Sequence, residues 1–176
     1  TSPSGRVLGI DLDSRSLAFA AQRLQTYGQR FSYLQGNYGN MVETARASGL
    51  TQVDGVLMDL GFSARQIQDP GFGFASDEPL DMRFDPEAHL TAEHIVNTYS
   101  ERELAQLIFQ YGEEPRARAI ARKLVRGRPV GSGVELAKLV ASTAGPGRRH
   151  RLHPATRTFQ ALRMVVNSEL SNLEMG

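Results

Sequence analysis

The chain has 176 residues, of which 40% are hydrophobic and 22% are charged, and this composition is typical of a folded chain with one sizeable core. No apolar run reaches the roughly 20 residues of a membrane span, and the first residues lack the apolar segment of a signal peptide. No cysteine is present, which excludes disulfides and thiolate chemistry and fits a reducing, cytoplasmic location.

Charge is distributed unevenly, although the net charge is only +1. Residues 1–114 contain 16 acidic and 8 basic residues, whereas residues 115–163 contain 12 basic residues and one acid, Glu135. We call residues 115–163 the basic block. A basic segment beside an acidic one is typical of a protein that binds a polyanion such as nucleic acid. A solvated helix surface is the alternative interpretation.

The first third of the chain alternates between apolar runs and helical patterns. Residues 6–11, 31–34 and 53–60 are predicted to be buried strands. A helix capped by Ser14 lies between the first two strands, and a helix at 40–48 lies before the third. This order predicts an α/β fold with a parallel sheet and right-handed crossovers.

The remainder of the chain has only helical patterns. Capping boxes start at Ser100 and Ser132, and residues 115–126 form an amphipathic helix between them. A long final helix opens after His153. We therefore expect an α/β domain at 1–90, an all-helical insertion at 91–150, and a returning helix at 151–176.

Three side chains follow predicted strands, where α/β enzymes place their ligands. Asp11 could accept hydrogen bonds from ribose hydroxyls, or it could be an acid at a helix N-terminus. Tyr38 could stack on a flat heterocycle, or it could belong to a plain turn. Asp59 ends an apolar run, and because burial of a carboxylate is costly we predict a functional role for it, with Gln66 within reach of the same ligand.

A loop rich in glycine, phenylalanine and acids follows the third predicted strand. Phe72 and Phe74 lie beside glycines and offer faces for stacking. Its acids lack the spacing of a hard-cation loop, so we expect internal ion pairs rather than a metal site.

Long motifs then indicate a family. VDGVLMDLGFS, PLDMR and HPATRTFQALR resemble the bacterial small-subunit (16S) rRNA cytosine-N4 methyltransferases, and the resemblance extends from about Arg6 to Glu174. It implies a class I fold dependent on S-adenosylmethionine, with a helical substrate domain inserted after the third strand. It also implies cofactor contacts at Asp11, Tyr38, Asp59 and Gln66.

The resemblance implies small-subunit ribosomal RNA, free or assembled, as the partner of a cytoplasmic monomer or homodimer. Asp59 or Asp81 would accept the proton of the cytidine N4 amine. The target base would leave its stack and lie against Phe72 or Phe74. The remaining predicted RNA contacts are basic side chains: Arg83, Arg116, Arg122, Lys123, Arg149 and Arg157.

The chain also departs from the family pattern. A strand with a glycine-rich loop is expected before Arg6, and further strands are expected after Glu174, so we interpret the chain as an internal fragment. Residues 62–65 read Phe-Ser-Ala-Arg where Val-Ser-Ser-Pro is usual. Two alternatives follow: an RNA-binding fragment without catalysis, and a nicotinamide-dependent oxidoreductase whose glycine fingerprint would lie in the same missing segment.

Overall fold

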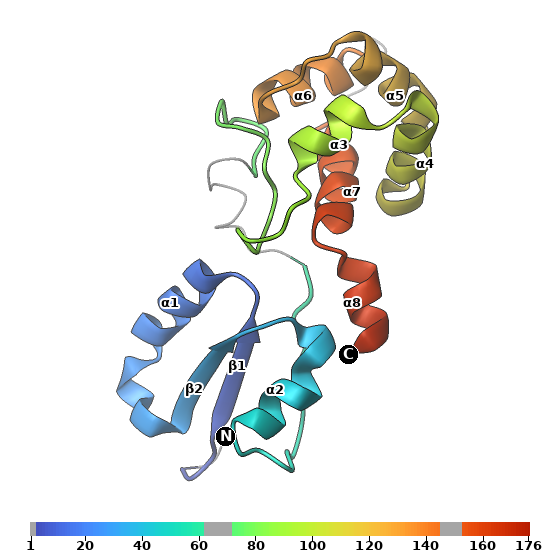
Figure 1. Cartoon of the computed structure of the whole chain (residues 1–176). Coiled ribbons are helices and arrows are strands. Elements are labelled where there is room, and N and C mark those ends of the chain that lie inside the picture. Colours follow the sequence, from blue (N-terminus) through green and yellow to red (C-terminus); the bar gives the residue numbers. More distant parts are fainter. Residues whose placement is uncertain (1–2, 62–71, 145–152) are drawn as a thin grey trace. The chain divides into compact units, whose positions relative to one another are not determined.

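The computed structural model describes residues 3–61, 72–144 and 153–176, and the chain divides into two compact units (Figure 1). The sheet unit comprises residues 1–60 and 169–176. The helical unit comprises the continuous stretch 61–168. The chain is thus a mixed α/β protein in which one unit carries the strands and the other carries helices and loops.

The sheet unit contains a short parallel sheet, as predicted. Strand β1 (Val7–Asp11) pairs in parallel with β2 (Phe31–Gln35), so that Asp11 lies opposite Gln35. Helix α1 (Ser14–Arg23) connects them, and its cap is Asp13 rather than the predicted Ser14. The other elements of the unit are η1 (Gln25–Arg30), η2 (Tyr38–Asn40), α2 (Met41–Ala47) and α8 (Glu169–Met175).

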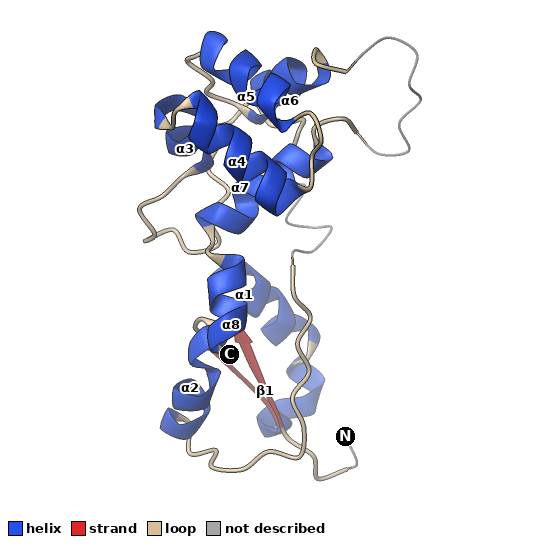
Figure 2. Cartoon of the chain, turned by 90° about the vertical axis from the view of Figure 1, so that its right-hand side faces the viewer, coloured by secondary structure: helices blue, strands red, loops and turns tan. Residues whose placement is uncertain are grey.

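The third predicted strand is wrong. Residues 53–60 form no strand, and among the described residues the sheet consists of β1 and β2 (Figure 2). Val56 is 65% exposed and Leu57 is 95% exposed. An apolar run becomes a strand only where another strand supplies hydrogen bonds and a layer covers its side chains. Here the run pairs with neither strand, and periodicity alone could not reveal this.

The helical unit is built around α4 (Glu101–Gly112), which packs against α5 (Ala117–Arg126) and α7 (Thr156–Val166). Helices α3 (Ala92–Thr98) and α6 (Gly133–Ala141) complete the unit. The largest fully buried side chains of its core include Ile95, Leu104, Ile108, Ile120, Leu124, Leu136 and Leu162.

The predicted capping boxes differ in outcome. The box at Ser100 is confirmed, because Ser100 Oγ accepts from Glu103 N and the Glu103 carboxylate accepts from Ser100 N. At Ser132 only half forms: Ser132 Oγ accepts from Glu135 N, but the Glu135 carboxylate accepts from Gly131 N at 2.8 Å. The second bond is thus displaced by one residue.

The single long final helix is also wrong. Helix α7 ends at Val166 and α8 begins at Glu169, with Ser168 between them at φ 50°. A left-handed residue ends the helical ladder. The apolar spacing continues across this break, so the pattern does not reveal it.

The loop at 72–85 packs into the helical unit, whereas we expected residues up to 90 to belong with the sheet. Leu80 and Met82 are 0% and 1% exposed within the helical core. Leu80 N donates to Gly131 O, and Glu93 N donates to Leu80 O. By these contacts residues 61–168 form one compact unit, and the domain bounds at 90/91 and 150/151 stay a prediction.

The close packing of the 72–85 loop on the helical unit requires a glycine at position 133. A Cβ at Gly133 would lie 2.1 Å from the carbonyl oxygen of Gly73, and Val134 N donates to Ser76 O beside it. We expect Gly133→Ala to destabilise the helical unit by about 1–3 kcal/mol, because backbone must move to admit the methyl group. Urea unfolding followed by far-UV circular dichroism measures this.

The control is Gly131→Ala, whose Cβ would meet nothing closer than Glu135 Oε2 at 3.8 Å. We expect a change within about 0.5 kcal/mol for this variant. Equal stability of the two variants would contradict the close approach of Gly133 to the loop.

Candidate functional site

The carboxyl edge of the sheet brings two predicted cofactor residues to neighbouring strand ends. Asp11 ends β1, and Tyr38 follows β2 after a short turn. Gly36 N donates to Asp11 O at 3.0 Å, which continues the pairing of the strands into this turn. Parallel strands present their ligand-binding loops at this edge. Both residues were predicted from their positions after strands, and both lie at this edge of the sheet unit.

The Asp11 carboxyl is held with one oxygen satisfied. Its Oδ1 accepts from Asp13 N at 2.8 Å. Desolvation of the carboxyl raises the pKa of Asp11; backbone hydrogen bonds from Asp13 and Leu12 oppose the rise, and the charge of Asp13 adds to it. Asp11 is an exposed residue at the strand end, so its carboxylate is accessible to a hydroxyl donor. The geometry fits a ligand with hydroxyl groups.

Tyr38 has a structural partner as well as a position at the edge. Its hydroxyl donates to the carbonyl oxygen of Glu169, at the start of α8, with 2.8 Å between the oxygens. Burial raises the pKa of Tyr38, and the charge of Glu169 adds to the rise. The hydrogen bond fixes the ring, which is half-buried, at the strand end.

Asp59 and Gln66 are less defined by the structure. Asp59 lies in the exposed run at 53–60, so the buried setting from which we argued for a functional role is wrong. Gln66 lies outside the described residues. The cofactor roles of both remain predictions.

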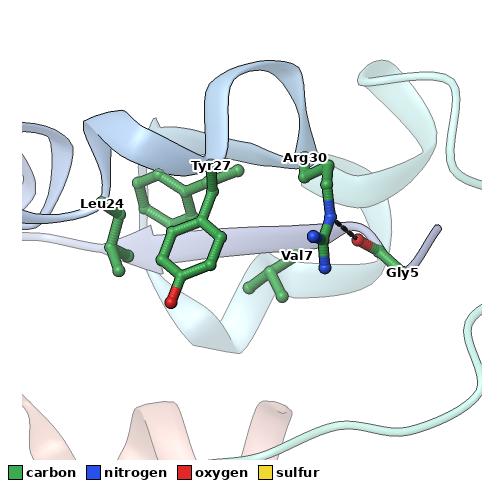
Figure 3. A pocket seen from close by; sticks show the side chains of 6 residues that line it. Gly5, Val7, Leu24, Tyr27 and Arg30 are labelled. Atoms are coloured by element: carbon green, nitrogen blue, oxygen red, sulfur yellow. Dashed lines mark hydrogen bonds between the residues drawn. The ribbon is translucent and has the colours of Figure 1, made fainter. Parts of the chain in front are cut away.

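A hollow of about 290 Å³ lies at the opposite end of the strands (Figure 3). Val7 and Phe31, the first residues of β1 and β2, line it together with Tyr27. Arg30 Nε donates to Gly5 O at 3.0 Å beside the hollow (Figure 3). Because Asp11 lies at the other strand end, this hollow is not part of the candidate cofactor edge.

The aromatic residues predicted to stack on RNA have ring partners inside the helical unit. Phe74 stacks on His153 with 4.8 Å between ring centroids and meets Phe159 edge to face at 4.6 Å. Phe72 stacks on Phe84 at 5.9 Å. Both rings are half-buried. Phe74 therefore anchors the loop between two rings, and its role as a stacking platform for RNA remains a prediction.

Asp81 and Arg83 form the internal ion pair that the acids of this loop predicted. Arg83 Nε donates to Asp81 Oδ1 at 2.6 Å, and Nη2 donates to Asp81 Oδ2 at 2.9 Å. Arg83 Nη1 donates to the carbonyl oxygens of Pro86 and Ala88. Both carboxylate oxygens of Asp81 thus already accept from arginine. Protonation of Asp81 would therefore compete with these two hydrogen bonds from Arg83.

Asn167 is a residue that the sequence analysis missed. Its Nδ2 donates to Met82 O at 2.8 Å, and its Oδ1 accepts from Phe84 N at 2.8 Å. Met82 has φ 64°, an unusual conformation for a residue other than glycine, and its side chain is buried. Asn167 therefore holds a strained turn whose flanking residues are Asp81 and Arg83. The only signal was a polar residue next to the apolar stripe of α7.

Several cations predicted to contact RNA have partners within the protein. Arg116 Nε donates to Glu114 Oε1 at 2.9 Å, and Arg157 Nη1 donates to Glu113 O at 2.9 Å. Arg122 reaches Glu101 at 3.4 Å in an exposed pair. Lys123 is exposed, and Arg149 lies outside the described residues.

Glu114 is a second missed residue. Its side chain is 5% exposed, and the guanidinium of Arg116 contacts both carboxylate oxygens. Burial alone would raise the pKa of Glu114, but hydrogen bonds from Arg116 and the charges of Arg116 and Arg157 outweigh burial and lower it. Charged groups are rarely buried without a partner, so this pair is part of the fold.

No helix in the described part of the chain combines the length and apolar character needed to cross a membrane.

Comparison with known proteins identifies the family. The model of the MraW methylase family matches residues 1–176. The chain is 49% identical over 181 residues to a protein of Thermomicrobium roseum named ribosomal RNA small subunit methyltransferase H, covering 100% of the chain and 55% of that relative. Proteins with the same name in Syntrophobacter fumaroxidans and Carboxydothermus hydrogenoformans are 47% and 46% identical, covering 99% and 97% of the chain.

The chain spans about half the length of these relatives, since the shares covered in the latter two are 56% and 57%. The match along the full chain confirms the resemblance indicated by PLDMR and HPATRTFQALR. The chain belongs to the MraW methylase family.

Proposed function

We propose that the chain is part of an enzyme that transfers a methyl group from S-adenosylmethionine to N4 of a cytidine in small-subunit ribosomal RNA. The observation that carries the proposal is the family match over the whole chain, with relatives named as methyltransferases of that RNA. A class I methyltransferase fold, to which β1 and β2 would contribute adjacent parallel strands, is part of the proposal.

The residues at the carboxyl edge of the sheet fit this cofactor. Asp11 offers an exposed carboxylate with Oδ1 bonded to Asp13 N, which suits the two hydroxyls of a ribose. The Tyr38 ring, whose hydroxyl is bonded to Glu169 O, would lie against the adenine region. When bound, S-adenosylmethionine supplies an electrophilic methyl group on a sulfonium. Asp59 and Gln66 complete the proposed cofactor contacts.

The reaction requires alignment and a proton acceptor. The N4 lone pair is delocalised into the cytosine ring, so positioning against the methyl carbon supplies much of the rate. As the new N–C bond forms and the S–C bond breaks, N4 loses a proton to a carboxylate. We assign this acceptor role to Asp59 before Asp81, because both oxygens of Asp81 already accept from Arg83.

The RNA would reach the helical unit as a single strand. A flipped cytidine would find the Phe72–Phe84 ring pair as a stacking surface. Basic side chains would hold the phosphates and position the strand without reading its sequence. Small-subunit RNA, free or assembled, is therefore the proposed partner.

The test is methyl transfer and cofactor binding by this chain. With labelled S-adenosylmethionine and small ribosomal subunits, we expect labelled N4-methylcytidine in the nuclease digest. Asp11→Asn should weaken cofactor binding about tenfold, because a charge-assisted hydrogen bond contributes about 1.5 kcal/mol or more. Isothermal titration measures the affinity, and Asp54→Asn, an exposed acid of the same unit, should leave it unchanged.

Label at an atom other than N4 would contradict the cytidine-N4 assignment. Equal binding by the Asp11 and Asp54 variants would contradict the ribose contact. RNA binding without cofactor binding or transfer would support the non-catalytic alternative.

A further inference from the structure

The outer face of α5 is almost entirely cationic. Its inward side is apolar, with Ala117, Ile120, Ala121 and Leu124 between 0% and 3% exposed. The exposed positions of the helix are Arg118, Ala119, Arg122, Lys123 and Arg126. Four of these five positions carry a positive charge, and the helix contains no acid. We call these four residues the α5 cation face.

Other cations of the basic block are occupied by the fold. Arg116 pairs with the buried Glu114, and Arg157 donates to Glu113 O. Arg128 donates to the carbonyl oxygens of Val96 and Tyr99. These three guanidinium groups donate to acceptors within the protein. Their substitution would therefore lower the stability of the fold and would not report on ligand binding alone.

The side chains of the α5 cation face make few interactions within the protein. Within the described ranges, Arg118, Lys123 and Arg126 have no hydrogen-bonded or ion-pair partner. Arg122 meets Glu101 at 3.4 Å, but their side chains are 58% and 46% exposed, and exposed pairs contribute little to stability. These residues are therefore available to a ligand that carries negative charge.

The arrangement also has a stability cost. Arg118, Arg122 and Arg126 follow one another at four-residue spacing, and like charges at this spacing oppose a helix by about 0.2–0.5 kcal/mol per pair. A surface needed only for solubility would mix both signs of charge. An unmixed stripe of cations is explained by a partner that neutralises it.

We propose that the α5 cation face is the surface on which the chain binds the phosphates of a single-stranded RNA. From Arg118 to Arg126 the stripe is about 12 Å long at 1.5 Å per residue, enough for consecutive phosphates. This inference rests on the proposed function for the identity of the RNA as ribosomal. It divides the basic block into anchors (Arg116, Arg128 and Arg157) and ligand contacts.

The experiment compares two triple variants of equal charge. One replaces Arg118, Arg122 and Arg126 with Gln; the other replaces Arg6, Arg23 and Arg46, exposed arginines of the sheet unit, with Gln. Binding of a fluorescein-labelled single-stranded RNA is followed by anisotropy over a series of salt concentrations. For the α5 variant, the slope of log affinity against log salt should fall by about 2, because each lost phosphate contact removes about 0.7.

The sheet-unit variant should keep the slope of the unmodified chain. The α5 variant should have an equal or slightly higher thermal midpoint, because two like-charge pairs at four-residue spacing are removed. Equal loss of slope in both variants would show an effect of net charge alone and would overturn the proposal. Competition by polyglutamate as effective as that by RNA would overturn it too. Salt-dependent binding through α5 without cofactor binding or methyl transfer would support the non-catalytic alternative and leave this inference standing.

Discussion

An Arg116→Ala variant is expected to lose about 3 kcal/mol of stability in the helical unit, near the lower end of the range for breaking a buried ion pair by removing one partner. The reason is Glu114, whose side chain is 5% exposed and would keep its charge without the two guanidinium hydrogen bonds. The backbone hydrogen bond from Arg116 N to the same carboxylate would remain. Chemical denaturation followed by helical circular dichroism measures the loss.

The matched control is Arg118→Ala, two residues along the chain, where the side chain is exposed. We expect a stability change within about 0.5 kcal/mol for this variant. Arg118→Ala should lower the affinity for RNA, because Arg118 belongs to the α5 cation face. Arg116 does not belong to this face, so RNA affinity should fall less in Arg116→Ala. Equal destabilisation by both would contradict the division of the basic block.

The stability difference between Arg116→Ala and the unmodified chain should depend on pH in a specific direction. The pKa of Glu114 is lower in the folded chain than its usual value of 4.5. A lowered carboxyl pKa gives stability that is present above the unfolded pKa and is lost as pH falls through the folded pKa. The unfolded state is common to both chains, so the difference should be constant at neutral pH. It should narrow as the pH falls towards the lowered folded pKa of Glu114, where the carboxylate of the unmodified chain also takes up a proton.

An Asn167→Ala variant is the second change with a large expected effect. It would leave Met82 O, which is buried, and Phe84 N, which is part-buried, without their side-chain partner. An orphaned buried group costs about 1–3 kcal/mol. Met82 would then lose part of what holds it at φ 64°. We expect a loss of about 3 kcal/mol and a more mobile turn around Asp81 and Arg83.

Hydrogen exchange separates a local effect from a global one. The Phe84 amide should lose protection in Asn167→Ala under conditions where core amides of α4 stay protected. Asn40→Ala is the control, because Asn40 is exposed and its side chain caps no helix. Unchanged protection of the Phe84 amide would contradict the role of Asn167 in holding the turn at Met82.

Local chemistry made much of the fold predictable. The complete capping box at Ser100 and the apolar positions of α5 were readable because each depends on neighbours three or four residues away. The parallel pairing of β1 and β2 followed from the order of elements. The unpaired run at 53–60, the break at Ser168 and the docking of Leu80 among helices depend on distant contacts, which periodicity does not encode.

The candidate site divides in a similar way. Asp11 and Tyr38 were found because strand ends meet at one sheet edge. Phe74, Asp81, Arg116 and Arg157 were selected by residue type, and residue type does not show whether a neighbour already occupies the side chain. Asn167 and Glu114 were missed because their roles depend on partners that folding brings to them. Asn167 bonds to the backbone of Phe84, and Glu114 pairs with the charge of Arg116.

The exposed run at 53–60 has a colloidal consequence. Its apolar centre, Val56-Leu57-Met58, is bordered by Asp54 and Asp59, and charged residues flanking such a segment discourage strand-to-strand aggregation. We therefore expect the charge of Asp59 to oppose self-association through this run. A variant without this charge should scatter more light at high concentration, so its activity is best compared at concentrations where the protein remains monodisperse.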